Sequence, residues 1–114
     1  MAYDDALAAR VREAVARRAE HEEIAMFGGL SFMVNTHLAV GLIRDDLLVN
    51  VGKGLYDEAI ANGAQPMVMG ARTMRGMVRV PAADLADQET LERWLGPAVE
   101  RALAKPRKPP KPVG

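Results

Sequence analysis

Two arginines, Arg72 and Arg75, carry the most suggestive chemistry in this sequence. They lie in a segment framed by Gly70 and Gly76, which we expect to be an exposed loop. A guanidinium can hold a phosphate or a carboxylate with two parallel hydrogen bonds, so the pair could bind an anion or a partner's acidic side chain. A salt bridge within the domain is the commoner role for surface arginines. We favour that role and keep partner binding as the alternative.

The other polar residues give weaker signals for catalysis or metal binding. The sequence has two histidines, His21 and His37, and no cysteine. The run His21-Glu22-Glu23 is too compressed for a helical zinc motif, and we expect both histidines on the surface. No serine or threonine is paired with a base, and the glycines at 52 and 54 lack the spacing of a phosphate-binding loop. The sequence therefore predicts no catalytic residue, no cofactor and no metal site.

Methionine is frequent, with seven in 114 residues, and four of these crowd the region from 67 to 77. Thioether sulfur can bind copper(I), but methionine also fills irregular cores. We expect Met67, Met69, Met74 and Met77 to have the packing role.

The stretch from 26 to 35 (MFGGLSFMVN) places Gly28 and Gly29 between the two phenylalanines of the chain. Apolar residues alternate after the glycines, with the two-residue period of a strand. We expect one strand from 24 to 34 with a bend at the glycines, and we expect Phe27 and Phe32 to pack the sheet onto helices. A ligand pocket beside the glycine pair is the alternative.

These residues must be positioned by helices and strands in the order α-β-β-β-α-β-β-α. The expected elements are a helix over 4–20, strands over 24–34, 38–43 and 47–51, a short helix ending at 62–63, strands over 66–69 and 77–80, and a helix over 91–103. Tight turns are expected at 35–36 and 44–46. Runs of strands joined by short turns and followed by helices predict an α+β domain with an antiparallel sheet packed by helices.

The last helix has the clearest pattern, an apolar stripe from Leu91 to Leu103 at helical spacing. Pro97 removes one amide donor, but the stripe keeps its phase, which predicts one kinked helix. The helix completes a folded domain over 1–104. Residues 105–114 are rich in proline and lysine, which predicts a disordered or polyproline-like tail.

The charge of the chain limits the class of partner. The 15 basic and 15 acidic residues balance, but Lys105, Arg107, Lys108 and Lys111 lie in the tail, so the folded body has 11 basic against 15 acidic residues, about −4. This is not the broad positive field of an autonomous DNA-binding domain. No apolar run is long enough to span a bilayer and the N-terminus lacks the blocks of a signal peptide, so we expect a cytoplasmic protein that does not enter membranes.

Several segments together resemble the N-terminal domain of the TfoX/Sxy family over about residues 5–104. They are 26–35, Ala39-Val40-Gly41, 46–51 (DLLVNV), the segment from Gly70 to Gly76, 78–81, and Trp94-Leu95. The resemblance implies an α+β domain related in fold to secretion-chaperone-like proteins. Full-length relatives are regulators of competence genes that act with a cyclic-AMP-responsive transcription factor and carry a second, C-terminal domain. We expect a stand-alone N-terminal domain, and the resemblance implies no catalytic residue.

The sequence therefore predicts a non-enzymatic regulatory or protein-interaction domain. Its partner would be a protein, with a transcription factor as the candidate and a homodimer as a further option. The sheet edge, the Arg72/Arg75 segment and the glycine pair Gly28-Gly29 are the candidate contact sites. The alternative is direct nucleic-acid binding through the basic tail with Arg72, Arg75 and Arg79, which would weaken steeply with salt.

Overall fold

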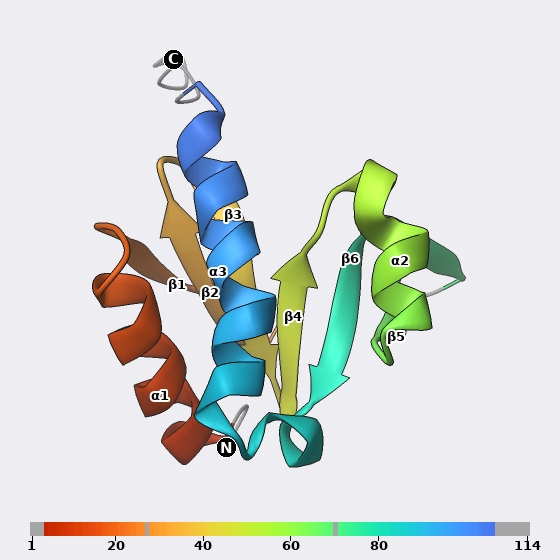
Figure 1. The fold of residues 1–114 in the computed structure, drawn as a ribbon, viewed down its shortest axis with the longest axis horizontal. Coiled ribbons are helices and arrows are strands. Elements are labelled where there is room, and N and C mark those ends of the chain that lie inside the picture. Colours follow the sequence, from red (N-terminus) through yellow and green to blue (C-terminus); the bar gives the residue numbers. More distant parts are fainter. Residues whose placement is uncertain (1–3, 27, 70, 107–114) are drawn as a thin grey trace.

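The computed structural model describes residues 4–26, 28–69 and 71–106, which form three α-helices and one six-stranded antiparallel sheet (Figure 1). The helices are α1 (Asp5–Ala16), α2 (Tyr56–Ala61) and α3 (Gln88–Ala104), with 3-10 turns η1 (Lys53–Leu55) and η2 (Ala82–Leu85). The strands are β1 (Glu22–Met26), β2 (Gly29–Val34), β3 (His37–Ile43), β4 (Asp46–Asn50), β5 (Gln65–Met69) and β6 (Arg72–Pro81). Their order across the sheet is β1-β2-β3-β4-β6-β5.

The fold confirms the α+β class, and the sequence of helices and strand runs fits the expected order. The first group of strands differs from the expectation. The segment 24–34, expected as one bent strand, forms a hairpin of β1 and β2. Met26 lies opposite Gly29 and Ile24 lies opposite Ser31. Gly28 makes the reversal possible with φ of +75°, a conformation that glycine adopts without strain. Phe27 lies outside the described residues.

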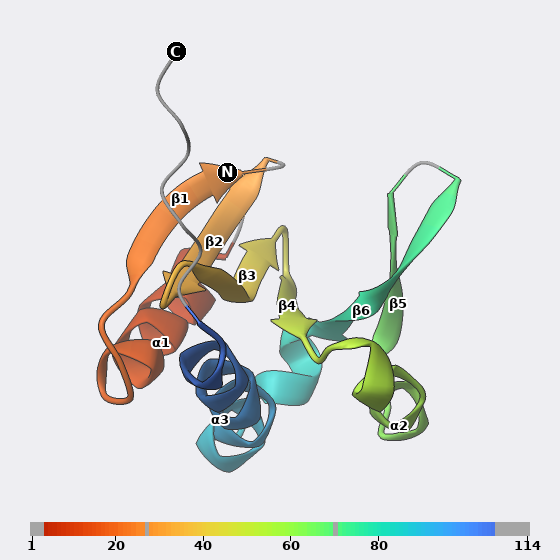
Figure 2. The same ribbon diagram turned by 90° about the horizontal axis from the view of Figure 1, so that it is seen from above.

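Helices α1 and α3 cover one face of the sheet, and the sheet curves so that both of its ends rise away from them (Figure 2). Alternate residues of the strands face these helices. Phe32 and Leu42 from the sheet are fully buried against Val11 of α1 and Leu91 and Leu95 of α3. Phe32 therefore has the expected role of joining the sheet to the helices.

Helix α1 begins directly after Asp4, which caps it. The Asp4 carboxylate accepts hydrogen bonds from the backbone N–H groups of Ala6 and Leu7, at 2.9 and 3.1 Å. These two donors would otherwise lack partners in the first turn. Helix α3 continues through Pro97 as one helix, as the unbroken phase of its apolar stripe predicts.

The expected turn at 35–36 is confirmed, with Asn35 and Thr36 both at positive φ. Asn35 also closes the far end of α3, because its Nδ2 donates to the carbonyl oxygens of Ala102 (3.3 Å) and Lys105 (2.6 Å). This turn therefore fixes the point at which the chain leaves the last helix.

A second, smaller core lies on the face of the sheet opposite the helices. Leu48 points there because its neighbours on β4 face the helices, and it packs with Met67 and Met77. All three are buried. Two of the crowded methionines thus have the packing role expected of them, whereas Met74 is 38% exposed.

Candidate interaction site

Strand β6 is longer than the strand it pairs with in the body of the sheet. Its pairing with β4 covers Met77 to Pro81, whereas among the described residues Arg72, Thr73 and Met74 pair only with β5. The register shifts sharply, since Pro66 lies opposite Val78 but Met67 lies opposite Met74. The result is a two-stranded extension, residues 67–69 and 72–76, which we call the arm; it projects from the sheet (Figure 2).

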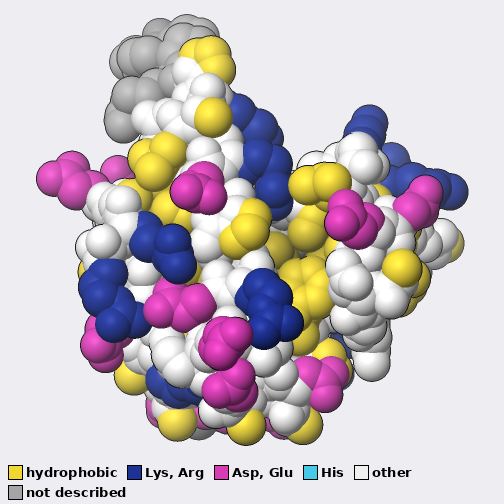
Figure 3. Space-filling model, in the orientation of Figure 1, with side chains coloured by type: hydrophobic (Ala, Val, Ile, Leu, Met, Phe, Trp, Pro, Cys, Tyr) yellow, Lys and Arg dark blue, Asp and Glu magenta, His cyan; other side chains and the backbone are white. Residues whose placement is uncertain are grey.

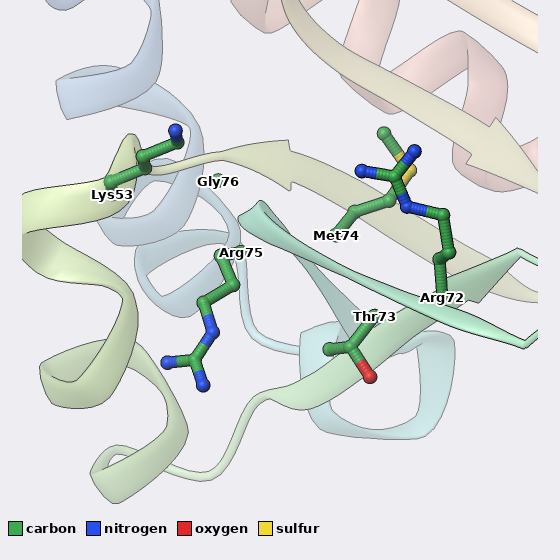
Figure 4. A pocket seen from close by; sticks show the side chains of 6 residues that line it. All are labelled: Lys53, Arg72, Thr73, Met74, Arg75 and Gly76. Atoms are coloured by element: carbon green, nitrogen blue, oxygen red, sulfur yellow. The ribbon is translucent and has the colours of Figure 1, made fainter.

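The arm corrects one expectation from the sequence. Arg72 and Arg75 were expected in a loop framed by Gly70 and Gly76, but both lie in β6. The alternation along a strand turns their side chains to opposite faces of the arm, with Thr73 on the side of Arg75 and Met74 on the side of Arg72 (Figure 4).

A concave surface that encloses about 610 Å³ lies along strand β6 of the arm and beside Lys53 (Figure 4). It is lined by Lys53, Arg72, Thr73, Met74, Arg75 and Gly76. Lys53 joins this surface because the Gly76 carbonyl accepts hydrogen bonds from the N–H groups of Val51 (2.9 Å) and Gly52 (3.1 Å). Gly52 adopts φ of +76°, which turns the chain from β4 into η1 beside the arm.

All charged groups on this concave surface are positive. Within the described parts of the chain, Lys53, Arg72 and Arg75 take part in none of the ion pairs, so the internal salt bridge favoured from the sequence is not formed. The Arg75 guanidinium instead lies over the Tyr56 ring of α2, 6.0 Å from its centroid. The arrangement gathers three cations around one hollow without an acidic side chain to neutralise them.

Apolar side chains are also exposed around the arm. Val68 on β5, Leu55 on η1 and Met74 on β6 are among the large hydrophobic residues that face solvent. Arginine, methionine and exposed apolar groups together are typical of the surfaces that bind proteins. The strand β5 lies at the edge of the sheet, so one side of its backbone is open to another strand.

Arg79 does not belong to this group, although the sequence placed it with Arg72 and Arg75. It lies in the part of β6 that pairs with β4, where its Nη1 is 2.9 Å from the Asp46 carboxylate. Its Nε also donates to the Pro66 carbonyl at 3.3 Å. The structure therefore gives Arg79 an internal role, and it separates this residue from the arm.

Gly28 and Gly29 lie on the β1–β2 hairpin, at the opposite end of the sheet from β5. A Cβ atom on Gly29 would lie 1.9 Å from the Leu42 carbonyl oxygen, so only glycine fits between these strands. Gly28 needs its positive φ for the turn. The pair has a backbone role, and the concave surface at the arm is lined by other residues.

The histidines differ from each other. His21 was expected on the surface, but its side chain is only 13% exposed and its ring lies 5.6 Å from that of Phe32. Its Nε2 is 3.3 Å from Glu23, which Arg12 also contacts at 2.7 Å. The hydrogen bonds from Arg12, more than the contact with His21, hold the pKa of Glu23 below its usual value.

His37 lies elsewhere, after the turn at 35–36. Its Nε2 contacts the Pro106 carbonyl oxygen at 2.7 Å.

The structure defines an antiparallel α+β domain with helices on one face and a cationic arm at one end. The family model of the TfoX N-terminal domain matches residues 13–102, so the chain belongs to the TfoX N-terminal domain family. No curated protein and no solved structure matches the chain. Among the described residues, no helix is long and apolar enough to cross a membrane.

Sequence reasoning missed Lys53 as a member of the cationic surface. Its neighbours Gly52 and Gly54 suggest a phosphate-binding loop, but their spacing does not fit one. The positive φ of Gly52 is the feature that brings Lys53 to the arm. The groove between α2 and α3 has no signal in the sequence, because its two walls are distant along the chain.

Proposed function

We propose that this domain is a non-enzymatic regulatory domain that binds an acidic segment of a protein partner at the arm. The observation that carries the proposal is that Lys53, Arg72 and Arg75 all line one concave surface, whose described lining contains no acidic residue. Carboxylates of a partner would supply the missing negative charge, and arginine can hold a carboxylate with two hydrogen bonds.

The chemistry around the cations favours a protein over a small anion. Val68 and Met74 offer apolar contact beside the charges. The open edge of β5 can also accept a strand from the partner, although Pro66 lacks the N–H that a full ladder would use. A partner segment with carboxylates and apolar side chains in an extended conformation fits all three features.

The similarity to competence regulators of the TfoX/Sxy type supports a transcription factor as the partner, encountered in the cytoplasm. A second copy of the chain is the other protein that could occupy the arm. The positive arm and the net-negative body are complementary in charge, which is the basis for including this option.

Quantitative affinity capture from the host cell tests the proposal. The full chain, the double variant Arg72→Ala/Arg75→Ala and the control Arg10→Ala/Arg17→Ala serve as baits, with protein mass spectrometry as the readout. The control removes the same charge from the α1 side of the molecule. We expect one protein that the wild type and the control retain and that the arm variant loses at least tenfold. Equal retention by all three baits would contradict the proposal.

Direct nucleic-acid binding is the second candidate, since the three cations at the arm would also hold phosphates. It predicts that oligonucleotide binding weakens steeply with salt and drops in Arg72→Ala/Arg75→Ala. The net charge of the body, about −4, opposes this function. Unchanged electrophoretic mobility of DNA and RNA at low salt would remove this candidate.

A further inference from the structure

A groove of about 200 Å³ separates α2 from α3. Figure 3 shows it as a hollow between α3 and the lobe that carries α2, with hydrophobic side chains inside and basic groups along its α3 side. Its lining includes Leu55, Glu58, Arg93, Trp94, Pro97 and Arg101. The groove is therefore apolar in its middle and charged at its margins.

Arg101 is the most unusual group in this groove. Its guanidinium donates to the Asn50 carbonyl oxygen and is partly buried, and the burial lowers its pKa. Within the described chain it has no carboxylate partner, as the ion pairs involve other arginines. A partly buried cation without a counter-charge is costly, and a ligand carboxylate would relieve that cost.

Arg93 lies at the other end of the same side of α3. Among the described residues its one ion pair joins it to Glu89, and both side chains are largely exposed, so the pairing is weak and exchangeable. Pro97 lies between the two arginines on the helix and has no N–H to give the Arg93 carbonyl, which leaves the backbone ladder short of a donor at the groove. Both ends of the α3 wall thus offer positive charge, and its middle offers a backbone acceptor.

The spacing of these groups defines a ligand pattern. Arg93 and Arg101 are separated by two helical turns, which is about 12 Å at 1.5 Å per residue. An extended peptide covers that distance in about four residues, and residues at positions 1, 3 and 5 point the same way. Two acidic residues four positions apart would reach the arginines, with an apolar residue between them on Trp94 and Leu55.

We propose that the α2–α3 groove is a second docking site, which binds a partner segment of the pattern acidic-x-apolar-x-acidic in an extended conformation. The inference rests on the proposed function as an interaction domain, and it assigns to the partner a second acidic segment besides the one at the arm. Lys53 faces the arm and Leu55 faces the groove, so η1 links the two sites.

Charge decides between the possible occupants. The segment 105–114 of this chain carries four basic residues and no acid, so it has the wrong sign for a groove whose open side bears Arg93 and Arg101. A nucleic acid would match the arginines, but Glu58 would repel phosphates and carboxylates alike, so the apolar middle of the groove decides: phosphates would leave it unfilled. An acidic protein segment with a central apolar side chain satisfies the cations and the apolar floor together.

The test uses Trp94, the only tryptophan of the chain, whose fluorescence reports directly on the groove. The probe is an acetylated and amidated pentapeptide of aspartate, serine, leucine, serine and aspartate, titrated into the full chain. The matched control peptide has asparagine in place of both aspartates. We expect the acidic peptide to bind about tenfold more tightly, because two partly exposed arginines each add a charge-assisted contact.

Variants of the protein assign the effect to the groove. Arg101→Gln should abolish the difference between the two peptides, Arg101→Lys should retain part of it, and Arg10→Gln should leave it unchanged. Leu55→Ser should weaken both peptides, whereas Leu103→Ser, another exposed apolar residue, should weaken neither. Thermal unfolding of each variant confirms that it is folded.

The proposal is overturned if the two peptides bind alike, if neither changes the emission, or if Arg101→Gln folds and still distinguishes them. It is also overturned if Trp94 emission depends on protein concentration alone, which would assign the groove to a second copy, or if a single-stranded oligonucleotide binds there more tightly than the acidic peptide. The arm is not part of this test. Loss of capture in the arm variant with no peptide binding here would contradict this inference alone, and the reverse result would contradict the proposed arm site alone.

Discussion

The Arg75 guanidinium lies over the ring of Tyr56, 6.0 Å from its centroid, and so connects the arm to the first residue of α2. Tyr56 is itself buried against the main core. The contact explains how a cation on a projecting strand is held in place without a carboxylate. It also means that the arm and α2 should respond together to substitution.

A double-mutant cycle tests this connection. Arg75→Ala and Tyr56→Leu should show a coupling of about 0.5–1 kcal/mol in the free energy of unfolding, the range for a cation over an aromatic ring at an exposed site. Urea unfolding of the wild type, both single variants and the double variant provides the measurement. Strictly additive effects would mean that the two groups do not interact.

The β1–β2 hairpin gives a second prediction. Gly29→Ala should destabilise the domain by about 3 kcal/mol or more, because its Cβ would lie 1.9 Å from the Leu42 carbonyl oxygen and neither backbone can move freely. Gly28→Ala should lower the free energy of unfolding by about 1–2 kcal/mol, because the new Cβ meets no other atom and only the positive φ is unfavourable. Gly54→Ala is the matched control. A Cβ there would meet no atom within 4 Å and φ is not positive, so the free energy of unfolding should not change. Equal losses at 28 and 29 would contradict this account.

Helix α1 depends on its cap. Asp4→Ala should lower the free energy of unfolding by about 1 kcal/mol, since the amide N–H groups of Ala6 and Leu7 lose their acceptor. Asp5→Ala removes an acid from the same turn without removing these bonds and should cost less. Chemical denaturation at neutral pH compares the two variants, and a larger loss for Asp5→Ala would show that the cap lies elsewhere.

Acid should weaken the contact between α1 and β1. Arg12 lowers the pKa of Glu23 in the folded state, so protons bind more tightly to Glu23 in the unfolded chain. The stabilisation is therefore present above the unfolded-state pKa of about 4.3 and is lost as the pH falls through the lower folded-state pKa. The stability difference between the wild type and Glu23→Gln should be larger at neutral pH than in strong acid. A difference that does not change with pH would rule out this role for Glu23.

The sequence predicted the parts of the fold that depend on local pattern. The stripe from Leu91 to Leu103 predicted α3, and Asn35-Thr36 predicted a tight turn, because both signals come from neighbouring residues. The reversal at Gly28 was not predicted, since the apolar run continues on both sides of it without a polar turn residue. Arg72 was placed in a loop because two glycines frame the segment and its residues do not alternate in polarity.

The candidate site was predicted in part. Arg72 and Arg75 could be selected as a pair of cations in one segment, but their lack of acidic partners depends on long-range packing. Lys53 reaches them only through the turn at Gly52 and the hydrogen bonds to Gly76. Arg79 has the same residue type and a similar position along β6, and only the structure shows Asp46 beside it.

Photo-crosslinking in the host cell from position 73, between the two arginines of the arm, tests the central claim most directly. A photoreactive residue at Thr73 is compared with one at Ala9, an exposed position on α1. We predict a covalent adduct with one protein from position 73 and none from position 9, and its loss when Arg72→Ala and Arg75→Ala are added. An adduct with nucleic acid, or a protein adduct that survives the loss of both arginines, would contradict the assignment of the arm as a protein-binding site.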